Sequence, residues 1–146
     1  MRSFRVSSAL RASPAEVWAR AATIAGVNAE LAPLARMTTP GEGEIREGAL
    51  GRSWILLGGV LPVDYDDLRL EAVEPGRAFR ERSTLGSCAE WHHDRTLHPL
   101  AGGGTRVVDE VSFTPRLRAA GGPQALIFEA AFRWRHRRLR ALWGAA

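Results

Sequence analysis

The chain has 146 residues, 45% of them hydrophobic and 25% charged, which is the size and composition of one ordinary folded domain and excludes the disordered and fibrous classes. No apolar run approaches the roughly 20 residues that cross a bilayer, the N-terminus carries no secretory apolar core, and the single cysteine excludes an internal disulfide. The net charge is +4 and the chain has arginine but no lysine, and most of these arginines are scattered along the sequence. We therefore expect a single cytoplasmic domain over residues 1–146 that does not bind nucleic acid.

The first predicted elements are a strand and a short helix. Apolar and polar residues alternate over residues 3–11, which is the period-two pattern of a strand. Ser13 is a good helix cap, Pro14 suits the first helical position, and Glu16 is spaced to reach back to the Ser13 amide. These residues predict a helix that begins after Ser13 and ends near Gly26.

After a second short helix over residues 25–31, the chain is expected to form strands joined by turns as far as about residue 115. Proline and glycine mark the ends of these segments, and the short connections between them favour an antiparallel meander. The predicted strands cover residues 34–38, 52–57, 63–73, 77–84, 88–97 and 105–113, with a loop at Pro40–Gly43.

The last segment is predicted to form a long helix over residues 123–143. At about 100° per residue, its apolar side chains cover more than half of the circumference and its charged side chains occupy the remaining stripe. Such a helix is expected to lie with its broad apolar face against a sheet, so the sequence predicts an α+β domain.

This order of elements, with three local motifs, resembles the START-like or SRPBCC superfamily, which includes polyketide cyclases, lipid-transfer domains and the birch-pollen-allergen family. The motifs lie at residues 13–18, at residues 73–77 and in the strand pair 91–97 and 104–111. The resemblance implies a helix-grip fold, in which a curved antiparallel sheet of about six or seven strands wraps around the C-terminal helix and encloses an apolar cavity. It implies no particular ligand, because the superfamily hosts many activities and the glycine-rich loop of the plant allergens is not matched at residues 41–43.

The two late strands place an acid on the face that should meet the helix. Alternate residues share a face, so Asp109 is expected beside His93 or Arg95. A buried charge is costly unless it is paired. Three interpretations stay open: a structural ion pair, a polar anchor for a ligand, and a catalytic group in which His93 and Asp109 act as general base and Arg95 stabilises an enolate.

Aromatic residues on separate strands would line the same cavity if each points inward. Glu81 shares a face with Phe79, so it is either a second carboxylate of the cavity or a sign that its strand leaves the pocket. The predicted ligand-binding residues are Trp54, Tyr65, Phe79, Glu81, Trp91, His93, Arg95, Val107, Asp109, Val111, Ile127, Phe128 and Ala131.

No metal or cofactor is expected. His92 and His93 are adjacent on a strand, so they face opposite sides and do not easily share one ion. The Gly41-Glu42-Gly43-Glu44 segment lacks the third glycine of a dinucleotide-binding loop.

Two other groups of reactive side chains are expected to be inert. Asp64, Asp66 and Asp67 lack the spacing of a calcium loop and are predicted to form a solvated strand end. Alternation along its strand places Cys88 toward solvent with no activating neighbour, so we do not expect a thiol nucleophile.

The predicted function is binding of a small hydrophobic or aromatic molecule, lipid-like or polyketide-like, in a cavity between sheet and helix. One alternative is an aromatase/cyclase-like enzyme that uses His93 and Asp109. A second is an interaction module in which the basic run at residues 133–140 contacts phosphates, an anionic membrane or RNA. The same arginines can instead favour the negative end of the helix dipole and lay their stems over the core. The oligomeric state stays open.

Overall fold

The structure is a computed structural model that describes residues 1–38 and 45–146. The loop expected at Pro40–Gly43 and the Gly41-Glu42-Gly43-Glu44 segment therefore lie outside the described residues.

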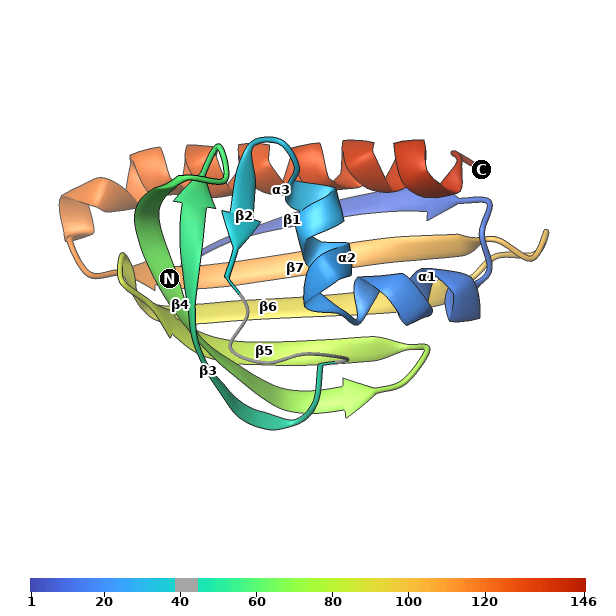
Figure 1. Ribbon diagram of the computed structural model, residues 1–146, viewed down its shortest axis with the longest axis horizontal. Coiled ribbons are helices and arrows are strands. Elements are labelled where there is room, and N and C mark those ends of the chain that lie inside the picture. Colours follow the sequence, from blue (N-terminus) through green and yellow to red (C-terminus); the bar gives the residue numbers. More distant parts are fainter. Residues whose placement is uncertain (39–44) are drawn as a thin grey trace.

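A strongly curved antiparallel sheet forms the frame of the molecule (Figure 1). In the described residues it has seven strands in the order β1-β7-β6-β5-β4-β3-β2, so consecutive strands from β2 to β7 are neighbours, as a meander requires. The strands are β1 (Arg2–Leu10), β2 (Ala35–Met37), β3 (Gly48–Leu57), β4 (Leu61–Glu74), β5 (Ala78–Leu85), β6 (Cys88–Pro99) and β7 (Thr105–Pro115).

The helices cover the concave face of this sheet. The long helix α3 (Gly121–Trp143) follows a short 3-10 turn, η1 (Arg118–Ala120), and runs along β1 (Figure 1). The short helices α1 (Pro14–Ala21) and α2 (Ile24–Leu31) follow the first strand, and α2 packs against α3. This is the α+β helix-grip arrangement, so the predicted fold class is confirmed.

One helix boundary was predicted wrongly. Helix α1 ends at Ala21 rather than near Gly26, because Thr23 caps a new helix by accepting a hydrogen bond from the Gly26 N–H at 2.9 Å. Gly26 lies within α2 at a close approach of two backbones, since a Cβ atom there would stand 1.8 Å from the Arg20 carbonyl oxygen. The glycine therefore serves packing and does not end a helix.

The capping box at the start of α1 is present as predicted. The Glu16 N–H donates to Ser13 Oγ at 3.3 Å, and the Ser13 N–H donates to Glu16 Oε2 at 3.0 Å. We expect Ser13→Ala to lower the free energy of unfolding by about 1 kcal/mol, because the Glu16 N–H then loses its hydrogen-bond acceptor. Urea denaturation measures the loss, and Ser7→Ala on the exposed side of β1 is the matched control. Equal stability of the two variants would contradict the prediction.

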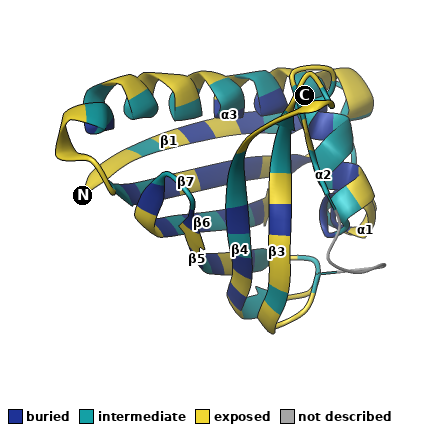
Figure 2. Ribbon diagram, turned by 60° about the vertical axis from the view of Figure 1, so that its left-hand side comes forward, coloured by how far each residue is buried: buried dark blue, intermediate teal, exposed yellow. Residues whose placement is uncertain are grey.

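Two separate apolar clusters lie between the sheet and the helices. The buried positions from which they come recur along the strands and α3 (Figure 2). The first, here called the Leu139 core, gathers at the C-terminal end of α3 with α1, and the second, the Trp91 core, gathers toward the N-terminal half of α3. The Leu139 core contains Leu10, Val17, Trp18, Ala21, Ala22, Leu70, Phe79, Leu97, Val107 and Leu139; the Trp91 core contains Val6, Leu85, Cys88, Trp91, Val111, Phe113 and Phe132.

Among the described residues, no helix is both long enough and apolar enough to span a bilayer.

Candidate functional site

A layer of buried polar side chains lies between the two apolar cores. Along β6 the inward residues run from Trp91 through His93 and Arg95 to Leu97, so polar residues follow one core and precede the other. The same sequence of apolar, polar and apolar residues recurs on β1, β7 and α3. We call this set the buried polar layer; it comprises Ser8, Glu30, Asp66, Glu81, Ser83, His93, Arg95, Asp109, Arg135 and His136, each at most 7% exposed.

Asp109 is the centre of the buried polar layer. Arg95 donates to both of its oxygens, from Nε to Oδ1 and from Nη2 to Oδ2, each at 2.8 Å. His93 Nε2 lies 2.7 Å from Oδ1 and His136 Nε2 lies 2.7 Å from Oδ2. Burial raises the pKa of Asp109, but the charges of Arg95 and His93 outweigh it and hold that pKa well below its usual range. The carboxylate is therefore ionised and accepts all four hydrogen bonds.

Glu30 on α2 is the second carboxylate bound by Arg95. Its oxygens accept from Arg95 Nη1 at 2.9 Å and from Nη2 at 2.8 Å, and Arg135 Nε donates to Oε1 at 3.2 Å. Burial raises the pKa of Glu30, but Arg95 and Arg135 outweigh it and lower that pKa below its ordinary value. The Arg95 guanidinium thus joins α2, through Glu30, to the sheet.

Three members of this network were missed or misplaced at the sequence level. Glu30 was not predicted, and Arg135 and His136 were assigned to an exposed basic run, although both are buried. The spacing of Phe132, His136 and Leu139 by four and then three residues puts them on one face of α3, and this signal would have placed His136 inward. Arg135 therefore does not belong to the exposed basic surface that was predicted for residues 133–140.

His136 also connects the layer to β1. Its Nδ1 lies 2.6 Å from Ser8 Oγ, which accepts a further hydrogen bond from Arg140 Nη1 at 3.0 Å. Ser8, His136 and Asp109 have the composition of a nucleophilic triad. The Ser8 side chain is nevertheless only 4% exposed, so this arrangement ties α3 to the sheet instead of presenting a nucleophile to solvent.

The other end of the layer holds two carboxyl groups on neighbouring strands, Asp66 on β4 and Glu81 on β5. Ser83 Oγ donates to Glu81 Oε2 at 2.7 Å, and His93 Nδ1 lies 3.7 Å from Glu81 Oε1. Asp66 is 5% exposed, and its Oδ1 has no hydrogen-bond partner among the described residues. The prediction that Asp66 belongs to a solvated strand end is therefore wrong. Asp66, Leu68 and Leu70 alternate along β4 and all point inward, a pattern visible in the sequence.

The protonation of this end follows from burial and from its neighbours. Burial raises the pKa of Asp66 well above its usual range, and the Glu81 carboxylate adds to that rise. Burial also raises the pKa of Glu81, but its interactions with His93 and Asp66 outweigh burial and lower that pKa. Burial lowers the pKa of His93, but Asp109 and Glu81 outweigh it and raise that pKa. Of the two, Glu81 is thus the stronger acid, and Asp66 holds its proton more firmly.

Trp54 and Tyr65 were predicted to line the cavity, and this is wrong. On β3 the buried residue is Ser53, so Trp54 points to the outer face and is 43% exposed. Its ring packs edge-on against Tyr65 on the same face, with ring centres 5.3 Å apart, and the Arg52 guanidinium lies 3.8 Å from the centre of the Tyr65 ring. The pair forms an outer-face cluster with no part in the buried polar layer.

The other apolar residues of the predicted site occupy three environments. Phe79 and Val107 belong to the Leu139 core, and Trp91 and Val111 to the Trp91 core. Phe128 is partly buried and packs edge-on against the Trp91 ring, 5.0 Å between centres. On α3, Ala131 is half-buried, but Ile127 is 65% exposed and does not line the interior, contrary to the prediction.

Cys88 does not face solvent as predicted. A shift of register between Cys88 and Glu90 on β6 interrupts the alternation, so that Cys88 is fully buried and Ala89 is exposed. Burial raises the pKa of the Cys88 thiol, which keeps it protonated and unreactive at neutral pH.

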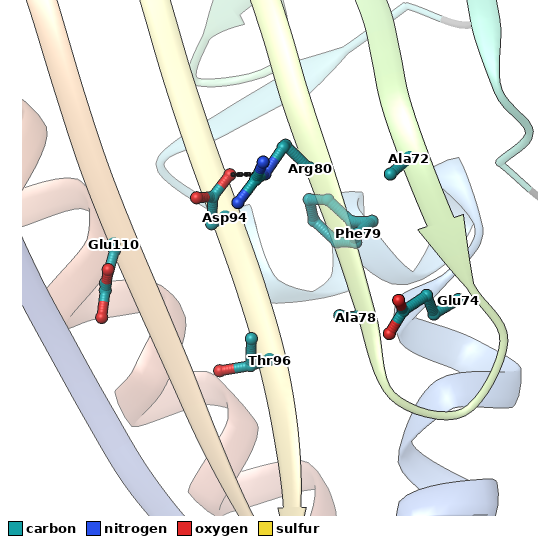
Figure 3. A pocket seen from close by; sticks show the side chains of 8 residues that line it. All are labelled: Ala72, Glu74, Ala78, Phe79, Arg80, Asp94, Thr96 and Glu110. Atoms are coloured by element: carbon teal, nitrogen blue, oxygen red, sulfur yellow. Dashed lines mark ion pairs between the residues drawn. The ribbon is translucent and has the colours of Figure 1, made fainter.

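A groove of about 460 Å³ lies on the outer face of the sheet, away from the helices (Figure 3). Three of its charged residues form cross-strand ion pairs: Arg80 Nε is 3.7 Å from Asp94 Oδ1, and Glu110 Oε1 is 3.7 Å from Arg5 Nε. In the described residues, no group of three or more His, Cys, Asp and Glu side chains is placed to hold a metal ion. The groove is lined by Ala72, Glu74, Ala78, Phe79, Arg80, Asp94, Thr96 and Glu110.

Several solved structures share this architecture. Protein CV1439 from Chromobacterium violaceum matches over 100% of both chains with a TM-score of 0.77 and 18% identity. The Zhui aromatase/cyclase from Streptomyces sp. R1128 matches over 94% of this chain and 90% of its own, with a TM-score of 0.71 and 15% identity. Ara h 8.0201 matches over 96% of this chain and 98% of its own, with a TM-score of 0.62 and 11% identity. These likenesses confirm the predicted helix-grip fold.

No curated protein matches the chain. A family model does match, described as Domain of unknown function (DUF8410), and it covers residues 8–143. That range runs from β1 to the end of α3 and includes every residue of the buried polar layer. The chain belongs to the family described as Domain of unknown function (DUF8410).

Proposed function

We propose that this domain binds a small, mostly apolar ligand on the concave face of the sheet, with the buried polar layer holding the polar group of that ligand. The observation that carries the proposal is the unpartnered Oδ1 of Asp66. Buried polar atoms nearly always have a hydrogen-bond partner, because an unpaired one costs about 1–3 kcal/mol. A ligand that donates to this oxygen would remove the cost.

The arrangement of the helices supports the same location. Helix α3 runs along β1 and against α2, so it lies over one half of the sheet, whereas Asp66 and Glu81 belong to the other half (Figure 1). The name of one structural neighbour, an aromatase/cyclase, fits a fold whose interior receives small organic molecules. Of the predicted ligand-binding residues, Phe79, Trp91, Phe128 and Ala131 supply the apolar surroundings in this proposal.

A pair of variants on α3 tests the proposal. Ala131 is half-buried and Ala130, its neighbour, is exposed. We expect the neutral apolar dye N-phenyl-1-naphthylamine to bind the native protein saturably, with an increase in fluorescence. Ala131→Phe should weaken that binding about tenfold, because the larger side chain takes up ligand space, and Ala130→Phe should leave it unchanged. The proposal fails if the dye does not bind, or if it binds all three proteins equally.

General acid–base chemistry at His93 is the second candidate, favoured by the 2.7 Å contact between His93 Nε2 and Asp109. The role first assigned to Arg95, stabilising an enolate, has less support. Arg95 donates four hydrogen bonds to Asp109 and Glu30, which leaves one of its five N–H groups uncommitted. In this candidate, His93→Gln abolishes turnover of a poly-β-ketone substrate and keeps its binding. Unchanged turnover would exclude it.

A further inference from the structure

We propose that the ligand carries an amine, and that its ammonium group binds to the carboxyl groups of Asp66 and Glu81. This inference rests on the proposed function and specifies the polar group that the site selects.

Among the described residues, no group donates a hydrogen bond to Asp66 Oδ1. Ser53 on β3 is the residue opposite Asp66, and its hydroxyl donates to the Thr38 carbonyl oxygen. The Ser83 hydroxyl donates to Glu81 Oε2 and accepts from the Arg69 N–H at 3.0 Å. Neither hydroxyl has a hydrogen left for Asp66 Oδ1. In this proposal an N–H or O–H group of the bound molecule is the donor to that oxygen.

The charges of the buried polar layer indicate which group this is. Three ionised carboxylates, Glu30, Glu81 and Asp109, are each in contact with a cationic side chain. The cationic side chains on them are Arg95, Arg135 and the protonated form of His93, which the raised pKa of that imidazole favours. With His93 protonated, these six groups balance in charge.

Asp66 is a fourth acid, and the part of the chain that the structure describes gives it no ion pair with a cationic side chain. The charged groups that act on it are the carboxylates of Glu81 on β5 and of Asp64 on its own strand, and both raise its pKa further beyond the effect of burial. These effects favour the neutral form of the acid in the free protein. An ammonium group would supply the missing positive charge, so that Asp66 loses its proton as the amine binds. A hydroxyl group would satisfy Oδ1 without this proton release.

Isothermal titration calorimetry at pH 7 with two matched probes tests the inference. The probes are 2-(naphthalen-2-yl)ethylamine, which is cationic at this pH, and the neutral 2-(naphthalen-2-yl)ethanol. We expect the native protein to bind the amine about 10- to 100-fold more tightly than the alcohol, because hydrogen bonds to charged groups are the stronger kind. Titrations in two buffers of different ionisation enthalpy should show close to one proton released per bound amine, and none for the alcohol.

Two isosteric variants provide the control. Asp66→Asn should lose both the preference for the amine and the proton release. Asp67→Asn should retain both, because Asp67 points to the outer face and pairs there with Arg52 at 2.8 Å. The comparison of the two probes on the native protein does not depend on how well either variant folds.

The outcomes separate the two proposals. Equal affinity for amine and alcohol in the native protein, or an amine preference that survives in Asp66→Asn, overturns the amine assignment. If the alcohol or the neutral dye still binds and Ala131→Phe still weakens that binding, the proposed function stands without it. If no probe binds, both proposals fall.

Discussion

Replacing Arg95 with methionine is expected to lower the free energy of unfolding by about 3–5 kcal/mol, as breaking a buried ion pair does in other proteins. The substitution keeps most of the side-chain volume but leaves Asp109 and Glu30 buried without their shared guanidinium. Urea denaturation at pH 7 measures the change. For a domain of this size the midpoint of thermal unfolding should fall by about 10 °C.

Two further variants show where the effect originates. Arg5→Met removes an arginine whose ion pair with Glu110 is exposed at 3.7 Å, and it should cost less than about 1 kcal/mol. Adding Glu30→Gln and Asp109→Asn to Arg95→Met should restore part of the lost stability, because the uncompensated charges disappear with the guanidinium. If Arg95→Met is as stable as Arg5→Met, the network does not hold the fold together.

The second large effect is the loss of stability in acid. Asp109 and Glu30 have folded-state pKa values below their unfolded values, so the stability they contribute is present above the ordinary carboxyl range and is lost as the pH falls through the folded pKa. Below about pH 4, the free energy of unfolding should fall by about 1.4 kcal/mol per pH unit for each proton that the protein takes up on unfolding. Free energies of unfolding measured from pH 7 down to pH 2 give this slope.

This prediction is tested by how steeply the free energy of unfolding falls with pH, and not by its value at any one pH. A double variant, Glu30→Gln with Asp109→Asn, should show a shallower decline than the native protein, since neither amide titrates. His93 acts in the opposite direction: its pKa is raised on folding, so its contribution is complete below about pH 6.5 and is lost as the pH rises through the folded value. Parallel acid declines in the native protein and the double variant would show that these carboxylates do not control acid unfolding.

The sequence was most informative where structure is set by near neighbours. The capping box at Ser13 and Glu16 and the turns between strands depend on a few adjacent residues, and the predicted elements agree with the structure apart from their ends. Alternation on β6 and β7 also placed Asp109 beside His93 or Arg95, and in the structure Arg95 is its register partner.

The predictions failed where geometry depends on distant segments. The burial of Cys88 depends on one irregularity of register with β7, which no alternation pattern contains. Glu30 meets Arg95 across 65 positions of sequence and Arg135 across 105. Arg135 and His136 were misplaced for another reason, because a run of basic residues is normally solvated and here the fold supplies buried acids to compensate two of them.

The separation of the two apolar cores by the buried polar layer determines how α3 can lie on the sheet. Apolar contacts are not directional, so a helix resting on them alone can slide by one turn, about 5.4 Å, and find similar surroundings. Here such a slide would carry His136 away from Asp109 and Arg135 away from Glu30. His136 and Arg135 would lose these buried partners, and Asp109 and Glu30 would each lose one of their hydrogen bonds. The polar contacts therefore specify a single longitudinal position for the helix, much as one polar residue fixes the alignment of a coiled coil.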